Sequence, residues 1–224
     1  MKVERTGLDN ARWAIRNKIE NMGNAVRQAL HQIIDALEQR DLRRAEAIIS
    51  GDQGFNESGE SIHNDCIALI ARQQPIASDL REIIADLQIA IELERIADHT
   101  ADIAHVVRQL QGEGVPPVEG DIRQMAERCE NMLAEMLHAY RDLDATRAEK
   151  VAAMDDSIDQ LNGRIVDKVI RFMQEHGSAV ADGTRIIWAV HNLERIGDRV
   201  TNIGEQILFA TSARIVDWNR SQQQ

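Results

Sequence analysis

The stretch "LERIADHTADI", residues 93–103, returns 100 residues later as "LERIGDRVTNI", residues 193–203. Both copies place Glu, Arg and Asp at the same spacing inside a run of Ile, Leu, Val and Ala. Apolar residues recurring every three to four positions are typical of a helix that packs against its neighbours. The repetition therefore indicates a helical unit that occurs twice in the chain.

The acidic residues of the first copy lie along one side of its helix. Each helical residue advances about 100°, so Glu94, Asp98 and Asp102 follow one another at intervals of one turn. Ile96 and Ile103 occupy the opposite side. We expect a central bundle helix whose acidic stripe needs a counter-charge, because stacked carboxylates repel one another when water is removed.

The composition favours an all-α protein. The chain has 224 residues, 43% of them hydrophobic but only 3% aromatic, with 13 Gly and 3 Pro. Its net charge of -11 would repel polyanions, so nucleic acid is not an expected partner. The sequence has no secretory leader and no apolar run long enough to span a bilayer, so we predict a cytoplasmic protein without direct membrane insertion.

Breaks in the helical pattern divide the chain into six long helices, three on each side of "QGEGVPPVEG", residues 111–120. Residues 1–111 are predicted to form one three-helix bundle, 112–118 a linker, and 119–224 a second bundle. Pro75 should stop the second helix and Ser78 should cap the third. The predicted helices are Leu8–Glu38, Leu42–Arg72, Ser78–Leu110, Glu119–Asp142, Thr146–Glu175 and Ala179–Ala210 or beyond.

The two halves align beyond the opening motif. "RAEAIISGDQGFN", residues 44–56, matches "RAEKVAAMDDSID", residues 147–159, so the pseudo-repeat covers the second and third helix of each half. Gly51, Gly54 and Gly59 should make the first copy of the second helix the looser one.

The second helices add matching polar pairs at aligned positions. Asp52 with Asn56, and Asp155 with Asp159, are each spaced by one turn. If the second and third helices pack antiparallel, these pairs face Glu94 with Asp98, and Glu194 with Asp198. The predicted metal ligands are Asp52, Asn56, Glu94, Asp98, Asp102, Asp155, Asp159, Glu194, Asp198 and Asn202. Oxygen ligands suit Mg²⁺, Mn²⁺ or iron, and zinc is possible.

Other interpretations compete with this one. A single ExxxD pattern is more often a solvated helix face, and a purely structural helical module is one alternative. Glu60 with His63, and Glu135 with His138, form ExxH pairs, so a carboxylate-bridged di-metal protein, a ferroxidase or metal store, is another. The ExxH pairs do not fall at aligned positions, which makes this the weaker reading.

The remaining chemistry-bearing residues point to no enzyme. The sequence contains no P-loop, nucleophile elbow or Cys/His nucleophile arrangement. Cys66 and Cys129 form no CxxC pair and should be buried thiols. Trp13, Trp188 and Trp218 are expected in the core or at an interface.

The motif residues resemble a known family. "LERIADHTADIA" and "NLERIGDRVTNIGE" are similar to the "ERIGDxxxNIxE" signature of the PhoU family, regulators of bacterial phosphate uptake, and "IARQQPIASDLR" resembles that family's stretch between the second and third helices. The resemblance covers nearly the whole chain and implies two tandem three-helix bundles.

The resemblance also implies a role. It implies E(D)xxxD motifs that hold multinuclear iron or zinc clusters, and a homodimer. It implies a non-enzymatic negative regulator at the inner face of the membrane, an adaptor between the ATPase of the phosphate ABC transporter and a sensor histidine kinase. Within this pattern the chain departs from the family at Asn56, at Ala97 in place of Gly, and at Asp102 and His105. We therefore predict two metal sites of unequal strength.

Overall fold

The computed structural model describes residues 2–110 and 117–221. Over these ranges every long regular element is an α-helix, which confirms the predicted all-α class. Most of the predicted linker, 112–118, lies outside the described residues. The elements are α1 (Lys2–Gln39), α2 (Leu42–Gln73), α3 (Ala77–Gln109), α4 (Glu119–Asp142), α5 (Ala145–Ala152), α6 (Asp156–Glu175), a 3₁₀ turn η1 (Gly177–Ala179), α7 (Val180–Ser212) and α8 (Trp218–Ser221).

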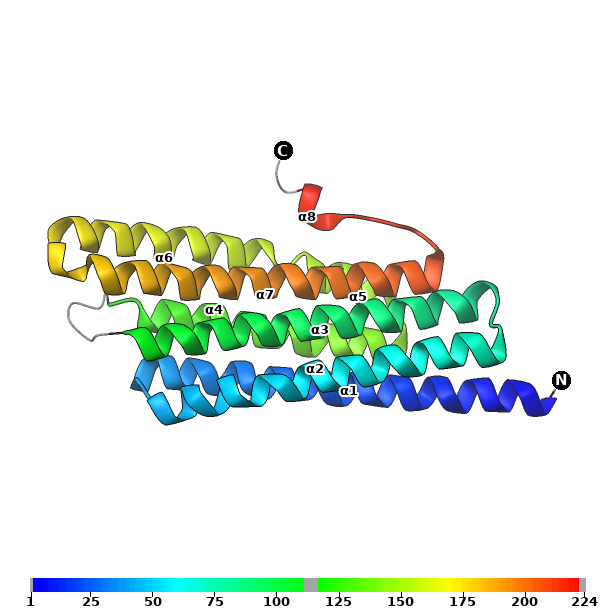
Figure 1. Cartoon of the computed structure of the whole chain (residues 1–224). Helices are drawn as coiled ribbons and strands as arrows, with labels where there is room; N and C mark the ends of the chain where they lie inside the picture. The colour runs from blue at the N-terminus through cyan, green and yellow to red at the C-terminus, as the bar shows by residue number, and fades with distance from the viewer. Residues whose placement is uncertain (1, 111–116, 222–224) are drawn as a thin grey trace.

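The helices form two bundles lying side by side (Figure 1). Helices α1, α2 and α3 pack on one another, and α7 packs on α4, α5 and α6. The most extensive contact between any two helices is that of α3 with α7, which joins the bundles; α1 also packs against α4. Buried apolar residues of both bundles form one continuous cluster, so the halves share a core. The two predicted tandem bundles are confirmed.

The two halves begin their second helices in the same way. Asp41 accepts hydrogen bonds from the backbone nitrogens of Arg43 and Arg44, at 3.0 and 3.1 Å. Asp144, at the aligned position, accepts one from the backbone nitrogen of Arg147 at 3.0 Å. A side-chain oxygen at this position pairs with an amide that lacks an intrahelical partner, typically worth about 1 kcal/mol. The duplication therefore extends to the caps.

The predicted fifth helix, Thr146–Glu175, is interrupted. Residues 153–155 form a turn that separates α5 from α6, whereas α2 runs unbroken through the aligned residues 50–52. The prediction that the glycines loosen the first copy is therefore wrong. Packing of α2 against α1 and α3 outweighs the intrinsic cost of its glycines.

Of three smaller predictions, one is wrong. Ser78 does not cap α3; Ile76 occupies the cap position and makes no side-chain cap hydrogen bond. Trp13 and Trp188 are 69% and 56% exposed, so they lie outside the core, and their place at an interface stays a prediction. Both cysteines are buried as expected.

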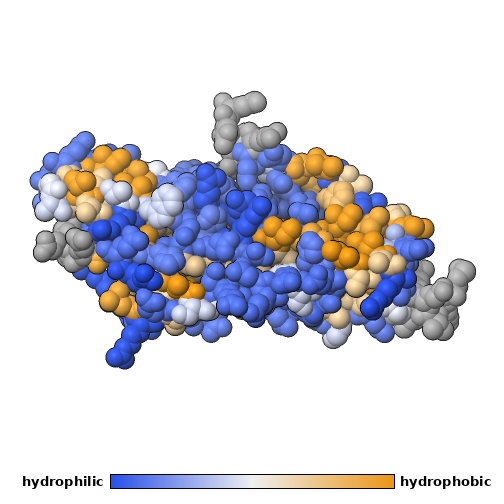
Figure 2. All heavy atoms as spheres, in the orientation of Figure 1, coloured by the Kyte–Doolittle hydropathy of each residue, from blue (hydrophilic) through white to orange (hydrophobic). Residues whose placement is uncertain are grey.

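The surface of the molecule is polar over much of the face in Figure 2. Figure 2 shows one face that is mainly hydrophilic along its middle, with apolar side chains gathered towards the two ends. Within the described residues, no helix combines the length and apolar character needed to cross a membrane.

Candidate metal centres

Helices α2 and α3 bring four predicted ligands together: Asp52, Glu94, Asp98 and Asp102, called here the first acidic cluster. Burial raises the pKa of Asp52, Glu94 and Asp98. Neighbouring carboxylates raise it further, Asp102 acting on Asp52, and Asp52 on Asp98. The antiparallel packing expected for the second and third helices is confirmed, because low-numbered residues of α2 face high-numbered residues of α3.

The first acidic cluster is partly neutralised by its surroundings. His105 and a hydrogen bond from Asn56 act to lower the pKa of Asp52, against the larger effect of burial. Asp52 Oδ1 is nonetheless buried without a hydrogen bond. The Arg95 guanidinium, which also acts on Glu94, donates instead to Glu92 Oε1 at 3.1 Å. One carboxylate oxygen of this cluster thus lacks a partner among the described residues.

Helices α6 and α7, with the turn before α6, bring together the aligned residues Asp155, Asp159, Glu194 and Asp198, called here the second acidic cluster. Burial raises the pKa of Asp155 to about 8, and Asp159, Asp198 and Glu194 add to the effect in that order. Burial, followed by the charge of Asp198, also raises the pKa of Asp159 and of Glu194.

Asp155 is the most constrained member of this cluster. Its side chain is fully buried, and neither of its carboxylate oxygens has a hydrogen-bond partner within the described structure. A Cβ at Gly197 would lie 2.4 Å from Asp155 Oδ1, so only glycine lets α7 approach the carboxyl this closely. A buried carboxylate without a partner costs free energy unless it takes a proton or meets a cation.

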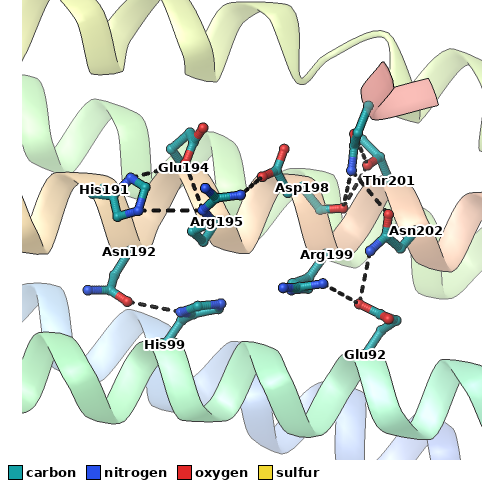
Figure 3. Close-up of polar contacts among 11 residues, drawn as sticks. Glu92, His99, His191, Asn192, Glu194, Arg195, Asp198, Arg199, Thr201 and Asn202 are labelled. Carbon is teal, nitrogen blue, oxygen red and sulfur yellow. Dashed lines mark hydrogen bonds and ion pairs between the residues drawn. The ribbon is translucent and has the colours of Figure 1, made fainter. Parts of the chain in front are cut away.

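The basic side chains near the second acidic cluster lie on α7, the helix that also carries Glu194 and Asp198 (Figure 3). Arg195 Nη1 donates to Asp198 Oδ2 at 3.1 Å, and Arg195 Nε lies 3.6 Å from Glu194 Oε2. His191 Nδ1 lies 3.4 Å from the same oxygen. Burial lowers the pKa of His191, and the charge of Arg195 lowers it further. Arg195 alone therefore offers a permanent positive charge to this cluster from α7, against four carboxyls.

Two further predicted ligands are placed differently. Asn202 turns away from the second acidic cluster, because its Nδ2 donates to Glu92 Oε2 at 3.1 Å and its Oδ1 accepts from Asn219 at 3.1 Å. Asn56 remains exposed beside Asp52. Sequence reasoning overlooked Asn162, which follows Asp159 by three residues on α6 and has a buried Oδ1 without a hydrogen bond.

The opposite side of α3 and α7 carries paired polar residues, called here the α3–α7 seam. Arg199 Nη1 lies 3.5 Å from Glu92 Oε2, and His99 Nδ1 lies 2.9 Å from Asn192 Oδ1 (Figure 3). Positions 92 and 192 are aligned in the repeat, as are 99 and 199. The seam is therefore approximately two-fold symmetric, with α3 and α7 antiparallel. Buried polar positions recurring in both copies were a signal for it in the sequence.

The donor set fits a hard or intermediate cation. Both clusters offer carboxylate oxygens from two helices, and both include a buried oxygen without a hydrogen bond. Within the described ranges, no three His, Cys, Asp or Glu side chains are already gathered as the shell of one ion.

The two ExxH pairs make different contacts. Glu135 Oε2 accepts from Arg147 Nη2 at 2.7 Å, which lowers the pKa of Glu135 and commits it to a cation of the protein itself. Glu60 and His63 line a hollow of about 240 Å³ that also contains Glu94. The two pairs thus lie in different surroundings.

Comparison with known proteins identifies the same repeat. A model of the PhoU domain matches residues 19–107 and 122–207. A phosphate-specific transport system accessory protein PhoU homolog from Clostridium acetobutylicum is 34% identical, over 92% of this chain and 94% of that protein. The accessory protein PhoU of Escherichia coli is 29% identical over 88% of this chain and 81% of that protein.

Solved structures agree with this match. The phosphate transport system regulatory protein PhoU from Streptococcus pneumoniae superposes with a TM-score of 0.89 and 28% identity, covering 94% of this chain and 99% of that one. PhoU from Pseudomonas aeruginosa gives a TM-score of 0.87 and 30% identity, covering 92% and 99%. The similarity therefore extends over both bundles.

Proposed function

The chain belongs to the PhoU family, and from that membership we propose that it is an accessory, regulatory protein of a phosphate transport system. Its relatives carry this description in their names, and they align with almost the whole chain. The finer role that we propose is negative regulation of phosphate uptake and of the phosphate-starvation response. In this role the protein is a cytoplasmic adaptor, without enzymatic activity, between the ATPase of the phosphate ABC transporter and a sensor histidine kinase.

We propose further that both acidic clusters bind metal. The observation that carries this proposal is the fully buried Asp155, whose two carboxylate oxygens have no hydrogen bond among the described residues. Asp155, Asp159, Glu194 and Asp198 would hold an ion in the second half, and Asp52, Glu94, Asp98 and Asp102 in the first. A bound cation supplies positive charge that neutralises these carboxylates. Iron or zinc, and with them Mn²⁺ or Mg²⁺, are the candidates.

The two sites should differ in strength. In the second half the aligned pair has two carboxylates, Asp155 in the turn before α6 and Asp159 on α6, whereas the first half has Asp52 with Asn56. Arg195 is bound to Asp198, while Arg95 is bound to Glu92 outside its cluster. The extra carboxylate favours stronger metal binding in the second half, whereas the bound Arg195 opposes it. The metal affinity of each half therefore has to be measured separately.

Equilibrium dialysis with Fe²⁺, Zn²⁺, Mn²⁺ and Mg²⁺ tests the metal proposal. We expect the wild type to bind, and Asp98→Ala combined with Asp198→Ala to lose most of the binding. Glu57→Ala with Asp167→Ala is the matched control, because it removes the same charge from exposed positions outside the clusters. Equal binding by the wild type and the cluster variant would contradict the proposal.

Affinity purification from cells grown in high and in low phosphate tests the adaptor role. We expect the wild type to recover the transporter ATPase and the sensor kinase, and recovery of neither would refute it. We also propose that the protein is a homodimer, and sedimentation equilibrium of the same protein tests this. Oxygen consumption with added Fe²⁺ separates a regulator from a ferroxidase, because only a ferroxidase should consume oxygen faster than free Fe²⁺ does.

A further inference from the structure

Residues 213–221, called here the tail, fold back along α7 instead of extending it. Helix α7 ends at Ser212, and its C-cap residue, Ala213, adopts the left-handed conformation at φ 59°. The next residues have no regular structure and are largely exposed, with Ile215 at 87%. The chain then returns along α7 to the short helix α8 (Figure 1). At the start of this connection the exposed Arg214 Nη1 lies 3.9 Å from Glu149 Oε1, and hydrogen bonds hold its far end.

Trp218 and Asn219 make the contacts that hold it. The Trp218 backbone nitrogen donates to Glu205 Oε1 at 2.7 Å. Asn219 Oδ1 accepts from Thr201 Oγ1 at 2.8 Å, and its Nδ2 donates to Asn202 Oδ1 at 3.1 Å. Figure 3 shows α8 next to Thr201 and Asn202. Both the oxygen and the nitrogen of the Asn219 side-chain amide are thus hydrogen-bonded to α7.

The surface beneath is shaped for an aromatic ring. A Cβ at Gly204 would lie 2.8 Å from Trp218 Cζ3 and 2.7 Å from Met136 Cε, so a larger residue would displace the indole. We call Thr201, Asn202, Gly204 and Glu205 the tail seat. The aligned residues of the first half are Ala101, Asp102, Ala104 and His105. None of these residues has a hydroxyl group to donate, and Ala104 carries the Cβ that Gly204 does not have. The duplication alone therefore does not explain the seat.

The tail seat is connected to the α3–α7 seam. Asn202, which accepts from Asn219, donates through its own Nδ2 to Glu92 Oε2 at 3.1 Å. Glu92 also faces Arg199. Asn219 Nδ2 additionally lies 3.3 Å from the backbone oxygen of Asp198, a residue of the second acidic cluster. Filling the seat therefore fixes the Asn202 amide that bridges to α3.

We propose that the tail seat is a recognition site for an aromatic residue followed by Asn, filled within the chain by Trp218 and Asn219 and open to the same segment of a second copy. The occupant is the chain's own sequence, so every contact is preserved when two copies exchange tails. The exposed connection before Trp218 is the only part that has to change its path. The attached tail competes at an effective concentration in the millimolar range, so exchange requires its release.

Peptide binding to the full-length chain tests the site. The receiving protein carries Trp218→Ala and Asn219→Ala, which empty the seat without shortening the chain. The probe is a fluorescent peptide with the sequence of residues 214–220. We expect saturable binding, at least about tenfold weaker in the wild type, whose own tail competes. A peptide with Ala in place of Asn219 should bind about tenfold more weakly.

Variants of the seat keep the test decisive. Gly204→Leu should abolish peptide binding in the receiving protein. Thr201→Val, a smaller change, should weaken it if Gly204→Leu disturbs folding, and circular dichroism monitors helix content in each. Absence of binding to a receiving protein with wild-type helix content would overturn the site. Equal binding of the peptide with and without its Asn would also overturn it.

Mixing two full-length variants tests the second copy as occupant. A tagged Gly204→Leu chain keeps its tail, and an untagged Trp218→Ala/Asn219→Ala chain keeps its seat. We expect more of the untagged chain to co-purify with the tagged chain than in a control mixture in which both chains carry all three substitutions. The control accounts for association through any other surface. Equal recovery in the two mixtures would refute exchange between copies.

Discussion

Asp155→Asn tests the second acidic cluster through the pH dependence of stability. Folding raises the pKa of this carboxyl from 3.8 to about 8, chiefly by burial. The folded protein therefore keeps a proton that the unfolded chain releases as pH rises from about 4 to about 8. Stability must fall across this window and carry the full penalty above it. A shift of about 4 pKa units corresponds to about 5 kcal/mol.

The neighbouring carboxyls share this titration, so we expect a measured loss of about 2–5 kcal/mol in metal-free wild type. Asparagine is nearly isosteric and cannot ionise. The free energy of unfolding of Asp155→Asn should therefore change little across the window, and the variant should be the more stable protein at about pH 8. Urea denaturation of chelator-treated protein at several pH values measures both curves.

Asp52→Asn is the matched control at the aligned position. Asp52 is only partly buried and retains a hydrogen bond from Asn56, so its substitution should change the pH dependence less. Adding Mn²⁺ or Zn²⁺ near neutral pH should stabilise the wild type more than Asp155→Asn, because binding to the folded state alone raises stability. Parallel pH curves for the wild type and Asp155→Asn would refute the reasoning.

Further predictions concern packing and reactivity. Gly197→Val should lower the stability measured by thermal unfolding by about 1–3 kcal/mol, because its Cβ would lie 2.4 Å from Asp155 Oδ1; Ala97→Gly at the aligned position should cost only about 1 kcal/mol. Tyr140→Phe should cost about 1–3 kcal/mol in urea denaturation, since it removes the 2.6 Å hydrogen bond to buried Asp86 Oδ1, and an unchanged midpoint would contradict this. Both cysteines should resist a thiol reagent until the protein unfolds, because they are buried and burial raises their pKa; rapid labelling of the native protein would count against this.

Local signals in the sequence predict most of the fold, and tertiary contacts explain where they fail. The Gly and Pro residues around position 115 and the helical periodicity on both sides indicate two helical halves. The turn at residues 153–155 has no such signal, because "VAAMDD" contains neither Gly nor Pro. Conversely, three glycines predict a loose helix where α2 is continuous. Intrinsic propensity is a weak term beside the packing of a long helix.

The acidic clusters could be predicted because they arise from spacing and duplication. Glu94 with Asp98, and Glu194 with Asp198, share a helix side by periodicity alone, and alignment supplies Asp52 and its counterpart. Periodicity cannot decide which neighbour a residue one turn further on will contact. Asn202 continues the same side of the helix, but the returning tail and Glu92 take both ends of its amide. Only the three-dimensional path of residues 213–219 reveals this.

The two sides of α3 and α7 around the repeated motif therefore make different contacts. Its Glu and Asp face α2 in the first half and α6 in the second, while positions 92, 99, 192 and 199 pair across the seam. The seam is nearly two-fold symmetric, but the two acidic clusters differ locally, because Asp155 lies in a turn and is fully buried whereas Asp52 lies in the continuous helix α2 and is half-buried. Individual residues distinguish the clusters further, such as Asn56 aligned with Asp159 and Ala97 aligned with Gly197. Exchanging these residues between halves, singly and together, should then move the stronger site from one bundle to the other, as metal titration of each variant would measure.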